Sequence, residues 1–501
     1  MKNLNYINGI SCDGLGKTFS VVNPANGTVI CEYKASTKED VEKAVEVARQ
    51  ALPKWKSTPL EERARILVNS ADLLIENQGN PGDFIKTDIM HLIIDEMGKA
   101  VSEAETEVFE TSDILRYFGS EAKEFIKDEI PTLDQMLWAT KTSVLKYQPV
   151  GVVGIIKAWN FPLEIPIWSI GAALLTGNTI VFKPSEHSPM IGEWLGHLFK
   201  KAGLPDGVFN VVVGNREVGE ALVDSNIDMI SFTGSTSTGK KIAQKCQERN
   251  IKVSLEMGGK DPAIVCNDAK LERAINGVVW GALVNAGQVC VSAERVYVQE
   301  KIYDSFVAGA LDLVKTLNVG NGWDPSTDMI TLISQSQLDK VDAQVKDAIA
   351  KGAKVLIGGH RLTGSKYDKG FYYAPTILVD VDNSMEVFTE ETFGPVLSIK
   401  KFSNYEEVLN EANNSEYGLG SSVWTESIEI ANFFANELEA GMVWINDINV
   451  CFPQCPWAGI KNSGVGYDLS KHGVYEYCKV KHINYENGED SVQPWWYPYQ
   501  K

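Results

Sequence analysis

The segment Val150-Gly-Val-Val-Gly-Ile-Ile156 decides the fold class, because a short run of apolar, mostly β-branched residues is typical of a strand buried on both faces. Comparable runs follow at 179–182, 208–213 and 229–232, and stretches of helical spacing lie between them. Strands that alternate with helices along the chain form a parallel sheet covered by helices. The sequence therefore predicts an α/β protein.

The same alternation returns in the second half of the chain and indicates a second α/β domain. Further strands are predicted at 263–266, 295–298, 355–357, 396–399 and 442–446. Near the N-terminus, 38–127 has the apolar spacing of a run of amphipathic helices. The segments 140–147 and 478–485 mix polar and β-branched residues, as in strands with one solvated face, and could pair with each other or across a subunit boundary.

Composition excludes several classes of function. The net charge of -19 argues against binding to nucleic acid or to anionic membrane surfaces. The apolar stretch 165–182 is interrupted by polar residues and is short for a bilayer span, so we expect a buried helix followed by a strand. The N-terminus lacks a secretory signal and the eight cysteines have no regular spacing, which predicts reduced thiols in the cytoplasm. The histidines and the pair Cys451 and Cys455 match no metal-ligand pattern, so no metal is expected.

Three residues are candidates for chemistry. Cys290 ends the segment Asn285-Ala-Gly-Gln-Val-Cys290, whose small residues permit tight turns that present a thiol to a cleft; the alternative is a small buried hydrophobe. Glu256 lies between an apolar run and a double glycine, where a desolvated carboxylate would act as a general base; the alternative is a surface residue at a strand end. Asn160 follows the first strand, and its amide could stabilise an oxyanion or simply shape the turn before Pro162.

A phosphate-binding loop is predicted at Phe232-Thr-Gly-Ser-Thr-Ser-Thr-Gly-Lys240, between a strand and a helix. The segment nearly matches the loop of P-loop nucleotide hydrolases, but Lys241 stands where the Mg²⁺-binding Ser or Thr belongs. The pyrophosphate of a dinucleotide, which needs no metal, fits better, although the chain has no convincing Gly-x-Gly-x-x-Gly fingerprint. Lys183 and Glu186 end another predicted strand, where they could hold ribose hydroxyls or form an ordinary charged loop.

Six motifs occur together along the chain: Trp159-Asn-Phe-Pro, Lys183-Pro-Ser-Glu, Phe232-Thr-Gly-Ser, Leu255-Glu-Met-Gly-Gly-Lys, Gly287-Gln-Val-Cys and Glu391-Thr-Phe-Gly-Pro. In order and separation they resemble the aldehyde dehydrogenase superfamily over essentially the whole chain. The resemblance implies two parallel α/β domains, one a cofactor domain of non-standard Rossmann type, and a small β oligomerisation arm. It places an NAD-binding domain at 1–125 and 149–257, a catalytic domain at 258–462, and oligomerisation or bridging segments at 126–148 and 463–501.

The resemblance also implies an NAD-dependent, non-acylating oxidation of an aldehyde to a carboxylic acid. Cys290 would be the nucleophile that forms a thioester, with Asn160 and the Cys290 backbone N–H as the oxyanion hole, and Glu256 would activate the hydrolytic water. Lys183 is predicted in this catalytic set as well as at the cofactor. Tyr467 and Asp468 depart from the family pattern, which often has Arg and Glu at positions associated with a secondary proton relay.

The cofactor site implied by the resemblance is lined by Ile156, Trp159, Lys183, Glu186, Gly234, Ser235, Glu391 and Phe393. Glu186 would hydrogen-bond the adenosine ribose, and its carboxylate would repel a 2′-phosphate, so NAD is preferred over NADP, with Lys183 as a partner for a phosphate if NADP binds. The expected partners are a small-molecule aldehyde and further copies of the chain, as a homodimer or homotetramer, and neither nucleic acid nor membrane. The aromatic tail 494–499 is expected to dock on its own or a neighbouring subunit.

The predicted substrate pocket is apolar or aromatic and comprises Phe161, Ile165, Trp168, Val284, Val291, Cys451 and Trp457. This lining favours an uncharged aliphatic or aromatic aldehyde. A betaine aldehyde or amino aldehyde is the alternative, because Phe161, Trp168 and Trp457 resemble part of a cation-π box that Val284 interrupts. Succinate semialdehyde is less favoured, since the arginines that grip a second carboxylate are missing at Trp168 and Val284.

Overall fold

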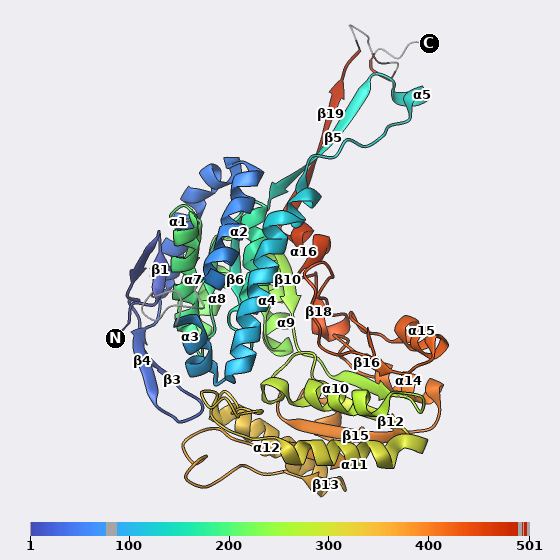
Figure 1. Ribbon diagram of the computed structural model, residues 1–501. Helices are drawn as coiled ribbons and strands as arrows, with labels where there is room; N and C mark the ends of the chain where they lie inside the picture. The colour runs from blue at the N-terminus through green and yellow to red at the C-terminus, as the bar shows by residue number, and fades with distance from the viewer. Residues whose placement is uncertain (1, 77–87, 489–492, 494, 498–501) are drawn as a thin grey trace.

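The computed structural model describes residues 2–76, 88–488, 493 and 495–497 and consists of two α/β bodies and a projecting two-stranded arm (Figure 1). The predicted α/β class is confirmed. Within the described residues, no helix is long and apolar enough to cross a membrane.

The first sheet has eight strands in the order β18-β10-β9-β6-β7-β8-β1-β2. Its centre is parallel, and β1, β2 and β18 join it in antiparallel orientation at the two edges. The strands are β1 (Asn5–Ile7), β2 (Ile10–Cys12), β6 (Val152–Ile156), β7 (Thr179–Lys183), β8 (Phe209–Val211), β9 (Met229–Thr233), β10 (Lys252–Glu256) and β18 (Gly464–Val465). The four strands predicted here from apolar runs are confirmed as β6 to β9, whereas β10 inside the sheet and the strands β1, β2 and β18 were not predicted.

Helices cover this sheet and include the predicted amphipathic run near the N-terminus. They are α1 (Lys38–Ser57), α2 (Leu60–Glu76), α3 (Asp88–Met97), α4 (Val101–Ser120), α6 (Glu164–Leu175), α7 (Pro189–Ala202), α8 (Arg216–Asp224), α9 (Thr236–Glu248), α16 (Ser470–Glu476) and the 3-10 turn η1 (Ala122–Ile126). Part of the predicted run, 77–87, lies outside the described residues.

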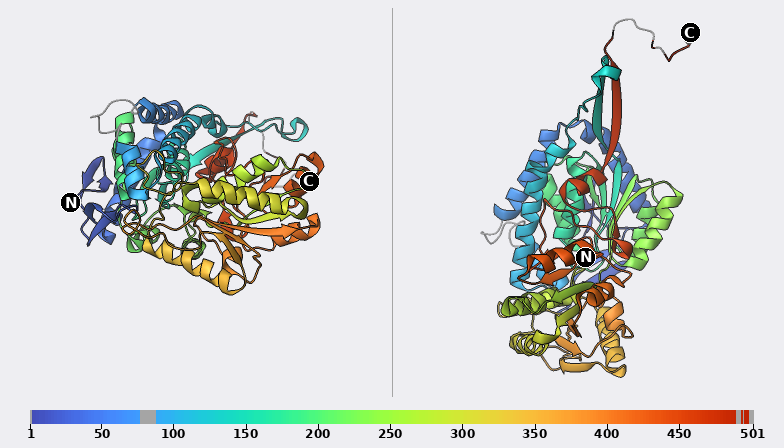
Figure 2. Two further views of the ribbon diagram at one scale, coloured as in Figure 1. Left: turned by 60° about the horizontal axis from the view of Figure 1, so that its bottom comes forward. Right: turned by 90° about the vertical axis from the view of Figure 1, so that its right-hand side faces the viewer.

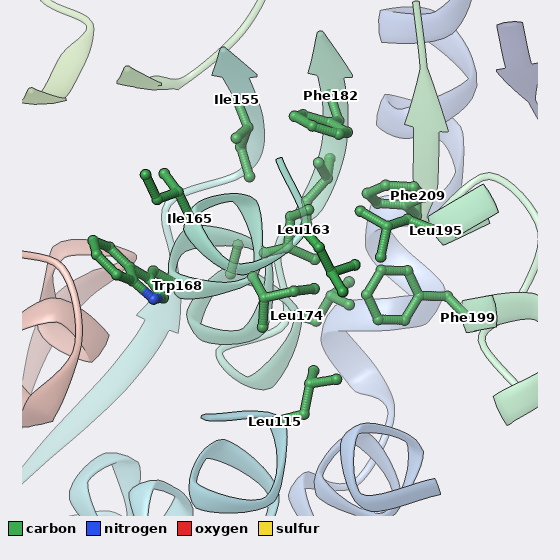
Figure 3. Packing of buried hydrophobic residues seen from close by; sticks show 14 of the residues in the cluster. Leu115, Ile155, Leu163, Ile165, Trp168, Leu174, Phe182, Leu195, Phe199 and Phe209 are labelled. Atoms are coloured by element: carbon green, nitrogen blue, oxygen red, sulfur yellow. The ribbon is translucent and has the colours of Figure 1, made fainter. Parts of the chain in front are cut away.

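Helix α6 is the centre of the first body, and it packs against α2 and α4 on one side and the sheet on the other. Every residue of α6 is buried, as expected of a helix that is apolar all round. Figure 3 shows Leu163 and Leu174 among side chains from the neighbouring strands and helices, with Phe182, Phe209 and Phe199 beside them. The predicted buried helix and strand at 165–182 are confirmed as α6 and β7. Both are buried along their whole length, and the site described below lies beside α6.

The second sheet has the order β13-β14-β15-β12-β11-β16-β17 and is parallel except where β13 meets β14. Its strands are β11 (Asp261–Val265), β12 (Ala293–Gln299), β13 (Lys354–Ile357), β14 (Thr376–Val379), β15 (Val396–Phe402), β16 (Ser422–Trp424) and β17 (Trp444–Ile445). The helices of this body are α10 (Leu271–Leu283), α11 (Glu300–Thr316), α12 (Gln335–Ala350), α13 (Glu386–Thr389), α14 (Tyr405–Asn413), α15 (Ile428–Glu437), and the 3-10 turns η2 (Val284–Gly287) and η3 (Lys461–Ser463). All five predicted strands are present, but the one predicted at 442–446 is shortened to β17, and β14 and β16 were not predicted.

The arm consists of β5 (Lys141–Pro149) and β19 (Cys478–Glu486), which pair in antiparallel register from Cys478 opposite Pro149 to Glu486 opposite Lys141. The two predicted strands therefore pair with each other, and they extend away from both bodies (Figures 1 and 2). Near the arm's end, Trp138 of α5 (Gln135–Trp138) packs edge to face against Trp495. Of the aromatic tail, Trp495, Trp496 and Tyr497 are exposed, and residues 494, 498 and 499 lie outside the described part of the chain.

An N-terminal hairpin of β3 (Thr18–Val22) and β4 (Val29–Lys34) forms a separate two-stranded sheet beside the first body (Figure 1). The sequence analysis predicted no strand in this region, because these strands alternate buried and exposed residues only briefly.

Candidate functional site

Two cavities meet where the loops of the two bodies come together, and Cys290 and Ile165 line both of them. One cavity has a volume of about 320 Å³ and lies against α4 and α6. The other, of about 190 Å³, lies at the carboxyl ends of β6, β9 and β10. A group bound in either cavity could therefore reach the same thiol.

The loop before Cys290 has an unusual backbone that presents this residue to the cavities. Asn285 and Ala286 have φ angles of 54° and 55°, in the left-handed region that costs free energy for a residue with a Cβ. Gly287 has a φ of 70°, and a Cβ there would lie 2.1 Å from the Gly394 carbonyl oxygen. The segment Asn-Ala-Gly thus turns the chain sharply between α10 and β12 and places Cys290 at the junction of the two bodies.

Asn160 is fixed against this loop by two hydrogen bonds. Its Nδ2 donates to the Gln288 carbonyl oxygen at 3.2 Å, and Asn285 Nδ2 donates to the Asn160 carbonyl oxygen at 3.0 Å. Asn160 is buried and lines the smaller cavity together with Cys290. Its amide has a second N–H, which makes it available to an oxygen bound beside the thiol.

Glu256 ends β10 and lines the same cavity as Cys290. Burial and, to a smaller extent, the neighbouring Asp468 raise the pKa of its carboxyl while Lys157 opposes the rise, and the resulting pKa is about 8. The Cys290 thiol donates a hydrogen bond to this carboxyl, and burial followed by the charge of Glu256 raises the pKa of the thiol well above its usual range. The thiol is therefore protonated in this arrangement, with a proton acceptor in contact with it.

A buried lysine, Lys157, supplies a positive charge near Glu256 that the sequence analysis missed. Its Nζ donates to Thr233 Oγ1 at 2.9 Å and lies 3.5 Å from Asp468 Oδ2. Asp468 also accepts a hydrogen bond from Ser169 Oγ at 3.1 Å. Asp468 thus reaches the lysine despite being one methylene shorter than the Glu common in the family. The position of Lys157, directly after the strand that precedes Asn160, was the available signal.

The smaller cavity collects most of the residues predicted to line a cofactor site. Trp159, Gly234, Ser235, Glu391 and Phe393 all contribute to its wall. Trp159 and Phe393 meet edge to face with ring centroids 5.5 Å apart. Glu391 Oε1 accepts a hydrogen bond from the Gly259 N–H at 3.2 Å, and burial raises the pKa of Glu391 to about 7.

The start of helix α9 is suited to an anion. Ser235 is the residue before its first turn but makes no capping hydrogen bond, and no acidic residue lies in that turn. The N–H groups of the first turn of a helix have no partner within the helix and carry a partial positive charge. The wall formed by Gly234 and Ser235 therefore fits a phosphate group of a dinucleotide.

Lys183, Glu186 and Ile156 lie apart from both cavities that Cys290 lines. Lys183 Nζ donates to the Pro184 carbonyl oxygen at 2.9 Å and lies 3.5 Å from Glu186 Oε2. The side chains of Lys183 and Ile156 both approach Gly219, where a Cβ would lie 3.7 Å from Lys183 Cδ and 3.9 Å from Ile156 Cδ1. The structure thus places these residues at the carboxyl ends of β6 and β7, and it brings Lys157 rather than Lys183 close to the catalytic candidates.

All residues predicted for the substrate pocket line the larger cavity: Phe161, Ile165, Trp168, Val284, Val291, Cys451 and Trp457. The indoles of Trp168 and Trp457 are in contact, with ring centroids 5.1 Å apart. Their rings and the aliphatic side chains give this part of the cavity an apolar wall.

Acidic residues also line the larger cavity, and the sequence analysis missed them. Glu103, Glu107 and Glu110 project from one face of α4, Glu164 begins α6, and Lys99 is the only basic residue among the described lining residues. Acidic residues spaced along an amphipathic helix give the same pattern as a solvated surface, and only the packing of α4 beside α6 places them at a cavity. Groups of acidic, cysteine and histidine residues arranged to hold a metal ion are absent from the described residues.

Comparisons with known proteins agree with the fold and show the family of the chain. The family model described as "Aldehyde dehydrogenase family" matches residues 11–483. The chain is 36% identical over 480 residues to a betaine aldehyde dehydrogenase of Bacillus subtilis, covering 95% of both chains, and 36% identical over 484 residues to retinaldehyde dehydrogenase 3 of Homo sapiens, covering 95% of this chain and 91% of the relative. The structure of an NAD+ complex of a Bacillus cereus aldehyde dehydrogenase superposes with a TM-score of 0.91 at 36% identity, covering 97% of both chains. The predicted resemblance is therefore confirmed, the P-loop hydrolase alternative is set aside, and the chain belongs to the aldehyde dehydrogenase family of oxidoreductases that act on aldehydes.

Proposed function

We propose that the protein oxidises an aldehyde to a carboxylic acid with NAD, through a thioester on Cys290. The observation that carries the proposal is that Cys290 lines both cavities while its thiol contacts the Glu256 carboxyl. One cavity would hold the aldehyde and the other the nicotinamide. Such an arrangement brings a nucleophile, a base and a redox partner together.

In the first half of the reaction, Glu256 takes the thiol proton and Cys290 Sγ bonds to the aldehyde carbon, while the carbonyl electron pair moves to the oxygen. Asn160 Nδ2–H and the Cys290 backbone N–H donate hydrogen bonds to this oxyanion. NAD, when bound, supplies the acceptor for the hydride that leaves the same carbon. Return of the oxyanion electron pair to the C–O bond leaves a thioester on Cys290.

Before the second half, Glu256 releases the thiol proton to solvent and is again a carboxylate. It then removes a proton from a water molecule that attacks the thioester carbon. The C–S bond then breaks, the carboxylic acid forms and Cys290 leaves as a thiolate. A carboxyl whose pKa lies near 8 is a stronger base than an ordinary Glu, so burial of Glu256 supports this role. The buried Lys157 and Asp468 adjust the charge around Glu256 without touching the aldehyde.

NAD is proposed in preference to NADP. The first turn of α9 would hold the pyrophosphate, and Trp159, Glu391 and Phe393 line the cavity that leads from it to Cys290. Glu186 is exposed at the end of β7, where its carboxylate would accept a ribose hydroxyl and repel a 2′-phosphate. The ammonium of Lys183, 3.5 Å from Glu186, is the group that could meet a phosphate, so NADP remains the second cofactor.

The substrate class has three candidates from the sequence. The apolar wall accommodates the hydrocarbon part of an uncharged aldehyde and equally that of a betaine or amino aldehyde. Succinate semialdehyde is less favoured, because carboxylates outnumber the single lysine in the described wall and would repel its second carboxylate. The predicted domain boundaries, the homodimer or homotetramer and the cytoplasmic location remain predictions.

The proposal is tested with the purified protein, a panel of uncharged, cationic and anionic aldehydes, and NAD or NADP. We expect NADH to appear together with an equal amount of carboxylic acid, measured by absorbance and by mass spectrometry, and a Cys290-linked acyl group on rapidly quenched protein. Reduction of NAD without acid formation, or an acyl group on another residue, would contradict the mechanism.

A further inference from the structure

The substrate cavity is lined by more carboxyl groups than cations. Four carboxylates and one ammonium line it. Lys99 Nζ lies 2.7 Å from Glu107 Oε2, and both side chains are almost completely buried, so this ion pair is internal to the protein. The other three carboxyls, those of Glu103, Glu110 and Glu164, form no ion pair with a described lining residue and share the charge of this one lysine.

Glu107 has a structural role that separates it from the other three. Its Oε1 accepts hydrogen bonds from the backbone N–H groups of Leu163 and Glu164, at 2.8 and 3.1 Å, where α6 begins. Lys99 lies on the face of the Phe161 ring, 3.5 Å from its centroid. Both charges of this pair therefore help to join α4 to α6, and Lys99 forms its ion pair with Glu107 while its charge also lowers the pKa of Glu103, Glu110 and Glu164.

Glu164 is buried, and its side chain contacts another carboxyl, that of Glu110. A buried carboxylate is usually paired with a cation instead. One of its oxygens accepts a hydrogen bond from Trp168 Nε1 at 3.3 Å, and its side chain is in hydrogen-bond contact with that of Glu110. Burial, then Glu110 and Glu107, raise the pKa of Glu164 well above its ordinary value. Two carboxyls in contact must share a proton or bind a positive group, because two adjacent negative charges repel each other strongly.

The position of these two residues suits the far end of a substrate. Glu110 and Glu164 line the cavity of Cys290 and also a neighbouring cavity of about 240 Å³ formed with Phe109, Asp113 and Pro453. Glu110 is exposed, whereas Glu164 is only 3% exposed. The pair thus lies between the thiol's cavity and an outer cavity, where a substituent would sit when its aldehyde reached Cys290.

Unpartnered oxygens in the same cavity call for a ligand that donates hydrogen bonds. Glu103 Oε2, Asn285 Oδ1 and Asn449 Oδ1 are buried oxygens of lining residues without a hydrogen-bond partner, whereas Trp457 Nε1 is the single such donor among the described lining residues. Asn285 as a whole is only 1% exposed. A buried acceptor without a donor costs free energy, so a ligand with several N–H groups would be favoured over one without any.

From these contacts we propose that the protein is selective for aldehydes with a terminal ammonium group, which binds Glu164 and Glu110 while the aldehyde carbon contacts Cys290. The inference rests on the proposed oxidation at Cys290 and names the substrate class of that site. The chain between the two ends would lie against Trp168 and Trp457. A primary ammonium has three N–H donors and fits the carboxyl pair, whereas a quaternary ammonium has none and would rely on the aromatic rings alone.

The test compares matched substrates on the full-length protein with NAD. The probes are 3-aminopropanal, butanal, in which a methyl replaces the ammonium, and betaine aldehyde as the quaternary cation. We expect kcat/KM for 3-aminopropanal to exceed that for butanal by at least about tenfold, which is the scale of one charge-assisted hydrogen bond. Butanal or betaine aldehyde as the best substrate of the three would overturn the proposal.

The variant Glu164→Gln keeps the size of the side chain and removes its charge. We expect it to lower kcat/KM for 3-aminopropanal about 10- to 100-fold and to change the value for butanal less than threefold, so butanal turnover also reports that the protein is folded. Glu105→Gln is the matched control, because Glu105 lies on the same helix but does not line the cavity. Equal losses for both aldehydes, or equal losses in the two variants, would contradict a role in recognition.

A binding measurement keeps this inference separate from the proposed reaction. Calorimetry on the unmodified protein would compare the binding of 3-aminopropan-1-ol with that of butan-1-ol. Both are alcohols, so neither can form a thioester with Cys290. Tighter binding of the amino alcohol that is lost in Glu164→Gln would support the ammonium site even if no aldehyde were oxidised. Equal affinity for the two alcohols would overturn it even if Cys290 oxidised aldehydes as proposed.

Discussion

The two cavities that meet at Cys290 are built in different ways. The smaller one is walled by residues at strand ends and in glycine-rich turns, including Glu256 after β10 and Gly234 after β9. The larger one is walled mainly by the helices α4 and α6 and by loops from the second body. Residues at strand ends are placed by the sheet itself, whereas residues on a helix face are placed by whichever helix packs beside it.

This contrast explains why the sequence predicted the residues proposed for catalysis but not the acidic residues proposed for substrate selection. The smaller cavity consists largely of short motifs, so its members are neighbours in the chain. In the larger cavity, Glu110 on α4 contacts Glu164 on α6, although the two residues are 54 positions apart in the sequence. No local sequence pattern predicts this contact. We expect substitutions near the thiol to affect all aldehydes alike and substitutions on the helical wall to affect them selectively.

The largest expected effect is that of Cys290→Ala, which removes the group shared by the two cavities. Oxidation of every aldehyde should fall by on the order of 10⁴-fold or more, because no thioester can form. Binding of NAD, measured by fluorescence titration, should persist because Cys290 supplies only one part of that cavity's wall. Substantial remaining NADH production would remove the thioester mechanism.

Glu256→Gln should lower the steady-state rate by roughly 10²- to 10⁴-fold, the scale of a lost general base. The wild-type kcat should also increase with pH up to about 8, because only the carboxylate accepts a proton and its pKa is raised to about 8 by burial and by Asp468, against Lys157. Glu391 and the Cys290 thiol are the other titratable groups that face it. The pH profile of kcat for butanal checks this assignment, and persistence of the same rise in Glu256→Gln would assign it to another group.

Asn160→Ala should lower kcat about 10²- to 10³-fold for charged and uncharged aldehydes equally, because the oxyanion is common to all of them. Its hydrogen bonds to the Gln288 carbonyl and from Asn285 also shape the loop before Cys290. Asn160→Asp keeps the size of the side chain and the hydrogen bond from Asn285 to the Asn160 carbonyl, but it removes the amide donor and with it the bond to Gln288, so it should lower kcat as well. A loss confined to 3-aminopropanal in either variant would show that Asn160 belongs to the specificity wall instead.

The smallest expected effect is that of Glu186→Ala, at the end of β7 and apart from both cavities. Removing a partly exposed charge is worth about 1 kcal/mol, so the ratio of kcat/KM for NAD to that for NADP should fall roughly fivefold. Turnover numbers with saturating NAD should change little. The ratio is measured with one aldehyde held constant, and an unchanged ratio would place the ribose away from Glu186.

The sequence analysis identified strands of both sheets, the two strands of the arm and the motifs at the thiol because each depends on local patterns, but it left open whether the arm strands pair with each other. It did not assign strands to the N-terminal hairpin, to β1, β2, β10 and β18, or to β14 and β16, most of which are short or lack a distinctive apolar run. It grouped Lys183 with the catalytic residues, whereas the structure places Lys157 beside Glu256 and holds Lys183 against Pro184 and Glu186. Both lysines end adjacent parallel strands, and only the direction of each side chain distinguishes them.

By itself, the sequence determined the α/β class, the family and the residues with a nucleophile, a base and an amide donor, because strand periodicity and glycine-rich motifs are local properties of the chain. Only the tertiary structure decided that Cys290 is shared by two cavities, that its thiol contacts Glu256, and that Lys99 is already paired with Glu107. These depend on which groups pack against one another across long stretches of chain. Burial and the charges of Asp468 and Lys157 then set the pKa of Glu256, and the packing of α4 beside α6 leaves one lysine among four carboxyls on the helical wall.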